Sequence, residues 1–173
     1  MIELIDINNT RLIQSELGSE YSTIQKLKLG GTGSTKAVYV NGIEYFKELV
    51  TEGNSLSYVS FELFPEGIVL RCSKDNSTSG AILKKNEIKY IHFESRRIKV
   101  KTRIVHDSKI QIELINNESI NLYCPTTFYK SMKTYWTKDW LNEKIDFTID
   151  PADPVIDSNG LILDTISNIL NIC

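Results

Sequence analysis

The feature that most constrains this chain is a two-residue alternation of apolar and polar side chains between residues 36 and 124. Successive side chains of a β-strand point to opposite faces, so this alternation is typical of strands with one buried face. Turn-forming residues separate the alternating runs, notably at residues 41–42, 65–67, 84–87 and 116–118. The middle of the chain therefore predicts consecutive antiparallel hairpins.

Several strands follow from this alternation. The Asn41-Gly42 dipeptide favours a type I′ turn, because both central residues need positive φ, and predicts a hairpin between residues 37–40 and 43–46. In the next strand, Val59, Phe61 and Leu63 share one face. Further strands are predicted at residues 68–72, 81–83, 88–93, 97–104, 110–114 and 120–124.

Two helices are expected, one before and one after the strands. The first runs over residues 10–17, with Thr10 as its cap and Gly18 as its stop, whereas residues 21–29 are compatible with helix or strand. The second begins at residues 125–127 and runs to about Leu141. Its large apolar side chains recur every three or four residues, so it must cover the open face or mouth of the sheet.

The length of 173 residues fits one domain with its own core. We expect a main domain at residues 1–145, followed at residues 146–173 by an acidic linker and a short amphipathic segment. The start has no basic region followed by an apolar run, and no apolar stretch approaches about 20 residues, so a soluble, cytoplasmic protein without a membrane span is expected.

The three cysteines argue against a disulfide framework and a structural zinc site, because none are paired at short spacing. Cys72 and Cys124 fall in apolar strand patterns and are expected in the core. The two histidines, His92 and an expected turn residue His106, have no metal-ligand spacing. Residues 30–36 lack the second glycine of a phosphate-binding loop and precede a strand. We therefore expect no catalytic residue, no metal and no cofactor.

The net charge of −2 conceals a basic middle section. Residues 61–110 contain 11 basic and 6 acidic side chains, which gives +5, while both flanks are acidic. Within one strand, residues two apart share a face, so four alternating cations would line about 20 Å of one side. These are Arg97, Lys99, Lys101 and Arg103, with Lys84 and Lys85 near them in sequence. The stripe would attract an anionic ligand, or it is the solvated face of a half-buried strand.

Residues 58–141 resemble the bacterial pleckstrin-homology-like (PH-like) and GRAM-like domains in the order of their elements. The resemblance rests on the stretches 66–71, 82–91 and 109–123 and on the aromatic helix that follows them. It covers about half of the chain and implies a bent antiparallel sheet or small barrel closed by the helix, and a role in binding lipids or proteins. A lipocalin-like barrel and an unclassified α+β fold remain alternatives.

The sequence thus predicts a mainly β, α+β protein that acts as a non-enzymatic interaction module. Its expected partner is a protein or an anionic surface, bound through the basic region at residues 84–103, and nucleic acid is not favoured. The alternative is a small oligomerising accessory protein, of the immunity or phage type, that associates through residues 161–170. An enzyme would need a pocket that unites His92 or His106 with a carboxylate or a cysteine.

Overall fold

The computed structural model describes residues 4–42, 58–73, 79–100 and 102–149. The strands are β1 (Leu4–Asp6), β2 (Ala37–Asn41), β3 (Tyr58–Phe64), β4 (Gly67–Ser73), β5 (Ser79–Lys84), β6 (Ile88–Val100), β7 (Arg103–Leu114), β8 (Ser119–Cys124) and β9 (Ile145–Ile149). The helices are α1 (Thr10–Leu17), α2 (Thr23–Lys28), α4 (Tyr129–Trp136) and α5 (Leu141–Lys144), with a 3₁₀ turn η1 (Thr126–Phe128).

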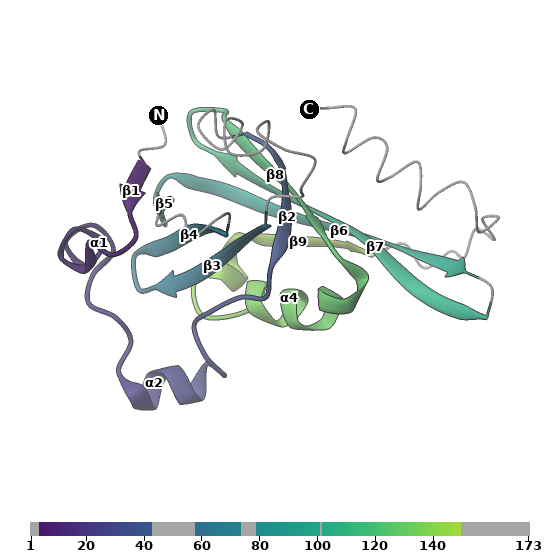
Figure 1. Ribbon diagram of the computed structural model, residues 1–173, viewed down its shortest axis with the longest axis horizontal. Coiled ribbons are helices and arrows are strands. Elements are labelled where there is room, and N and C mark those ends of the chain that lie inside the picture. Colours follow the sequence, from purple (N-terminus) through teal and green to yellow (C-terminus); the bar gives the residue numbers. More distant parts are fainter. Residues whose placement is uncertain (1–3, 43–57, 74–78, 101, 150–173) are drawn as a thin grey trace.

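The described strands form one open sheet in the order β1-β5-β4-β3-β2-β8-β7-β6-β9 (Figure 1). The mainly β, α+β class is confirmed. Strands β1 and β9 are the two edges of the sheet, so of the two predicted arrangements, a sheet or a small barrel, the barrel is wrong. Every pairing is antiparallel except that of β6 with β9, which is parallel. Parallel pairing requires a crossover connection, and here η1, α4 and α5 supply it between β8 and β9.

Neighbouring strands in the chain mostly pair as hairpins, as predicted. Strand β3 pairs with β4, β4 with β5, β6 with β7 and β7 with β8. Strand β2 lies between β3 and β8 and joins the two halves of the sheet. The partner predicted for β2 at residues 43–46 lies outside the described residues. The type I′ turn predicted at Asn41-Gly42 is wrong, because Gly42 has a positive φ but Asn41 does not and is the last residue of β2.

The β6–β7 hairpin differs from the strand predicted over residues 97–104, which contains the predicted stripe of cations. Strand β6 runs without interruption to Val100, and the chain reverses at Thr102 so that Val100 pairs with Arg103. The predicted strand over residues 97–104 is therefore wrong. Polar residues such as Ser95 interrupt the apolar alternation, but Ser95 is buried and pairs with Ser108 across the hairpin. His106, expected in a turn, lies within β7.

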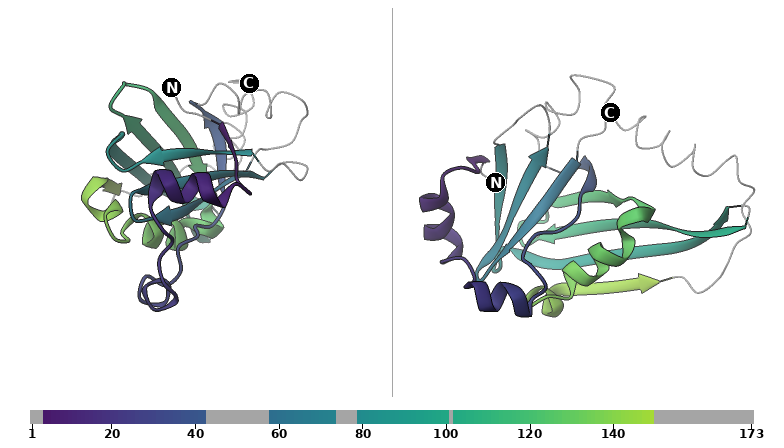
Figure 2. Two further views of the ribbon diagram at one scale, coloured as in Figure 1. Left: turned by 90° about the vertical axis from the view of Figure 1, so that its left-hand side faces the viewer. Right: turned by 60° about the horizontal axis from the view of Figure 1, so that its bottom comes forward.

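One face of the sheet packs against the chain that follows β8 (Figure 2). Met132, Tyr135 and Trp136 of α4 are buried against residues such as Phe61, which confirms the apolar stripe of the expected helix. The single helix expected up to Leu141 is instead divided into η1, α4 and α5. The interruption falls where Asp139 adopts a positive φ of 46°, a conformation that cannot continue a right-handed helix.

A smaller apolar cluster covers the opposite face at the β4–β5 end of the sheet. Ile13 and Leu17 of α1 pack there with Phe64 and Val69. Helix α1 has the predicted bounds, but the side chain of Asn9 caps it rather than that of Thr10. The predicted linker begins later than residue 146, because β9 continues to Ile149. Residues 161–170 lie outside the described residues.

Removing the hydroxyl of Tyr135 is expected to leave stability unchanged or to raise it. The Tyr135 hydroxyl is buried and has no hydrogen-bond partner among the described residues, and an unsatisfied buried group costs about 1–3 kcal/mol. Tyr135→Phe should therefore raise the free energy of unfolding in urea by up to about 1 kcal/mol. Trp140→Phe is the matched contrast, because Trp140 Nε1 donates to the Phe64 carbonyl at 2.9 Å and its loss should destabilise. A lower stability of Tyr135→Phe would show that the hydroxyl has a partner.

Candidate functional site

The β5–β6 turn presents two of the predicted site residues, Lys84 and Lys85. The turn is tight because Glu87 N–H donates to the Lys84 carbonyl at 2.9 Å. The Glu87 side chain accepts in return from Lys84 N–H at 3.2 Å. The lysine side chains therefore project from a short, hydrogen-bonded loop.

Backbone hydrogen bonds join this turn to two other elements. Lys85 N–H donates to the carbonyl of Glu66, in the β3–β4 turn, at 2.8 Å. Glu66 N–H donates to the carbonyl of Leu17, the last residue of α1, at 3.1 Å. The close approach depends on Gly67, where a Cβ atom would lie 2.4 Å from the Leu83 carbonyl oxygen and 2.6 Å from Leu17. Residues far apart in the sequence are thus held beside the turn.

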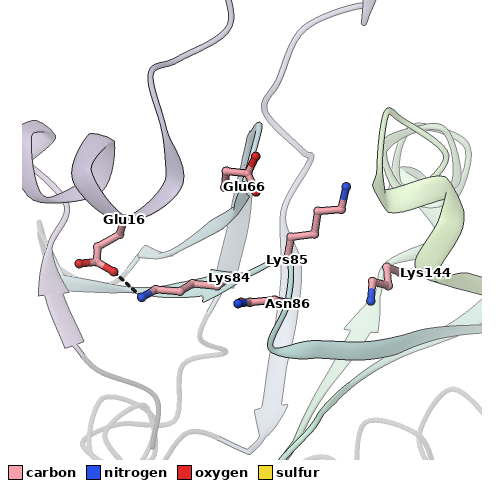
Figure 3. A pocket seen from close by; sticks show the side chains of 6 residues that line it. All are labelled: Glu16, Glu66, Lys84, Lys85, Asn86 and Lys144. Carbon is pink, nitrogen blue, oxygen red and sulfur yellow. Dashed lines mark ion pairs between the residues drawn. The ribbon is translucent and has the colours of Figure 1, made fainter.

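A cavity of about 380 Å³ opens where these elements meet (Figure 3). Helix α1 contributes Glu16, the β3–β4 turn contributes Glu66, and Lys144 lies at the end of α5. The complete lining consists of Glu16, Glu66, Lys84, Lys85, Asn86 and Lys144. Below, these six residues are called the lysine cavity.

The lysine cavity has more positive than negative side chains, and its charges are only partly paired. Lys84 forms an ion pair with Glu16. Lys85 Nζ lies 5.7 Å from the centre of the Trp140 ring, a cation–π arrangement that keeps the ammonium group at the surface. Within the described part of the chain, neither Lys85 nor Lys144 has a carboxylate within ion-pair distance. Two ammonium groups are therefore available to an incoming anion.

The remaining predicted site residues are not part of this cavity. Arg97 is nine residues beyond the start of β6, which corresponds to about 30 Å along a strand. Lys99 pairs with Ile104 and Arg103 with Val100, so these cations belong to two antiparallel strands. Lys101 lies outside the described residues. The structure thus divides the basic region at 84–103 between the two ends of the long hairpin.

Four residues of the lysine cavity were not among the predicted site residues: Asn86, which adjoins Lys85, and three from elsewhere in the chain. Glu16, Glu66 and Lys144 come from three separate elements, and no local pattern connects them with Lys84 and Lys85. Their only shared property in the sequence is charge. Tertiary contact alone brings them together.

The histidines have separate environments. His92 Nδ1 lies 3.3 Å from Asp146 Oδ2, whereas His106 contacts Ser95 at the far end of the hairpin. In the described ranges, no three histidine, cysteine or carboxylate side chains are grouped as metal ligands. Cys72 and Cys124 are buried, as expected for core residues.

Across residues 4–149, apart from the gaps noted above, no helix combines the length and apolar character that crossing a bilayer requires. Comparison of the chain with protein-family models, with curated proteins and with solved structures finds no match.

Proposed function

We propose that this protein is a non-enzymatic interaction module that receives acidic side chains of a protein partner in the lysine cavity. The observation that carries the proposal is that one cavity holds two ammonium groups, on Lys85 and Lys144, with no carboxylate partner among the described residues. Acidic side chains of a partner would form charge-assisted hydrogen bonds to these ammonium groups.

The character of the lining favours a protein partner over a small organic ligand or cofactor. Small-molecule sites are lined mainly by apolar and aromatic side chains with few polar groups. All six side chains of the lysine cavity are polar or charged, and two of them are carboxylates. Such mixed charge is typical of the polar parts of protein interfaces, where it sets orientation and selects the partner.

The contact between Ser95 and His106 does not favour a nucleophilic serine. Ser95 Oγ lies 3.2 Å from His106 Nδ1, but Ser95 and its neighbour Ser108 are fully buried. A nucleophile must reach the substrate, and this serine is covered. The order of strands followed by the packed helix α4 is the feature shared with the proposed PH-like resemblance, whose members commonly bind partners. The open sheet and its parallel β6–β9 edge differ from the antiparallel sheet or small barrel that the resemblance implies.

The test is binding of a fluorescently labelled hexaglutamate peptide, measured by polarisation at low and moderate salt. The unmodified protein should bind it, more weakly at the higher salt because exposed charges are screened. Lys85→Gln combined with Lys144→Gln should weaken binding about three- to tenfold, since each exposed ion pair contributes about 0.2–1 kcal/mol. This loss of affinity for hexaglutamate should exceed the change in affinity that the same double variant shows for a hexalysine peptide.

The matched control is Lys28→Gln combined with Lys109→Gln, which changes the net charge equally at exposed positions outside the cavity. This variant should bind hexaglutamate almost as the unmodified protein does. Equal weakening in both double variants would contradict a defined site and leave only overall electrostatic attraction.

A further inference from the structure

A second cationic site surrounds His106, at the end of the β6–β7 hairpin away from the lysine cavity. Arg97 lies directly opposite His106 in the strand register, and such residues share a face of the sheet. Tyr129 of α4 stacks on the His106 ring, with ring centres 3.8 Å apart and planes within 3°. Lys130 follows Tyr129, and Lys133 lies one turn further along α4, on the same side as Tyr129.

Hydrogen bonds hold His106 in position and are compatible with a neutral ring that accepts at Nδ1. Ser108 Oγ donates to Ser95 Oγ at 2.9 Å, which leaves the Ser95 hydroxyl proton for His106 Nδ1 at 3.2 Å. In this assignment the neutral ring accepts at Nδ1 and keeps its proton on Nε2. Thr126 Oγ1 also donates to the His106 carbonyl at 2.6 Å. The preorganised ring therefore offers an N–H donor on the side away from the serines.

The charges around His106 are positive and lack compensation within the described part of the chain. Arg97, Lys130 and Lys133 have no carboxylate partner there, and Lys133 Nζ lies 5.7 Å from the centre of the Phe147 ring. Burial lowers the pKa of His106, and Arg97, Lys133 and Lys130 lower it further by repulsion. Three cations thus act on one imidazole.

The other titratable groups nearby do not offset these cations. Burial raises the pKa of the Cys124 thiol, which pairs in register with Ser108, to about 12, so it stays neutral. The Tyr129 ring stacks on the imidazole. Asp107 follows His106 in β7 and therefore points to the opposite face of the sheet.

We propose that Arg97, His106, Lys130 and Lys133 bind a phosphate-type oxyanion, with His106 donating from Nε2. A phosphate group can accept several charge-assisted hydrogen bonds at once, and arginine and lysine are its usual partners in proteins. The bound anion removes the repulsion that keeps His106 neutral, so His106 takes up a proton on binding. This site is separate from the lysine cavity and does not rest on the function proposed there.

The sign of the pH dependence follows from this linkage. The pKa of His106 is low in the free protein and rises when the anion is bound. Affinity should therefore increase as pH falls through the interval between the two values, about three- to tenfold from about pH 7.5 to about pH 5.5. Sulfate is the appropriate probe, because its own charge stays constant over this range.

The experiment is a sulfate titration by calorimetry at several pH values, with the His106 ring followed by NMR. Addition of sulfate should raise the pKa of His106. His106→Gln, which retains an N–H donor, should bind sulfate with little pH dependence. Lys130→Gln combined with Lys133→Gln should weaken binding about three- to tenfold at every pH. Lys28→Gln combined with Lys109→Gln is again the control with equal charge change and should bind normally.

Two results would overturn the proposal: a His106 pKa that sulfate does not move, or equal sulfate affinity in the Lys130/Lys133 variant and the unmodified protein.

Once sulfate binding is observed, co-sedimentation with phosphatidate vesicles identifies the source of the phosphate group. Binding to vesicles that depends on Lys130 and Lys133 indicates a lipid head group. Sulfate binding without co-sedimentation indicates a soluble phosphorylated ligand. Lys85→Gln combined with Lys144→Gln should leave sulfate binding intact, so the two sites can fail independently.

Discussion

Replacing Trp136 with alanine is expected to lower the free energy of unfolding by about 3–5 kcal/mol. Trp136 is fully buried, and its ring meets Phe61 edge-on with centres 5.0 Å apart and Tyr135 with centres 5.1 Å apart. The substitution leaves a large cavity between α4 and the sheet, because helix and strands cannot collapse onto it. Urea unfolding followed by far-ultraviolet circular dichroism measures the change.

The control for Trp136→Ala is Thr137→Ala, at the exposed next position. That variant should change the free energy of unfolding much less. If the native state stays compact, both variants should keep the same dependence of this free energy on urea concentration as the unmodified protein. A loss below about 1 kcal/mol for Trp136→Ala would contradict the packing of α4 on the sheet, since core truncations of this size cost several times more.

Alanine at position 42 is expected to destabilise the protein by about 2–4 kcal/mol, for two independent reasons. Gly42 has a φ of +117°, which a residue with a Cβ atom rarely adopts. A Cβ atom there would also lie 2.0 Å from the Ser119 carbonyl oxygen and 2.7 Å from Ile120 Cα. Both contacts are with the backbone of β8, which cannot move without disturbing the β2–β8 pairing. Thermal and urea unfolding measure the loss.

Gly33→Ala is the matched control for Gly42→Ala. At Gly33 a Cβ atom would meet nothing within 4 Å, and its φ lies outside the positive region. This variant should be neutral or slightly stabilising, because alanine restricts the unfolded chain more than glycine does. Equal stability of the two variants would show that the end of β2 does not approach β8 as closely as described.

Much of the local structure could be predicted because its signal lies in neighbouring residues. The alternation of Val59, Phe61 and Leu63 identified the buried face of β3, and all three side chains are buried. Helix α1 ends at Gly18, where φ is +79°. The same kind of signal was present but missed in β9, where Ile145 and Phe147 alternate with Asp146 and Thr148. This signal was missed because the acidic segment from residue 146 onward was interpreted as a linker.

The continuity of β6 was harder to predict because its polar residues are satisfied by tertiary contacts. Ser95 interrupts the apolar pattern, and only its hydrogen bonds to Ser108 and His106 make it acceptable inside a sheet. The basic residues that follow were therefore assigned to a separate strand. The turn at Thr102 has no glycine or proline to mark it, so four alternating cations were interpreted as one stripe.

The sequence by itself determined most of the strands, where most turns fall and the apolar stripe of α4. These properties depend on periodicity and turn chemistry, which act over a few residues. Only the tertiary structure decided the strand order, the parallel β6–β9 pair, the lysine cavity and the grouping of Arg97 with His106 and α4. Those features depend on contacts between residues far apart in the sequence. The free energy of such contacts cannot be read from the pattern of neighbouring residues.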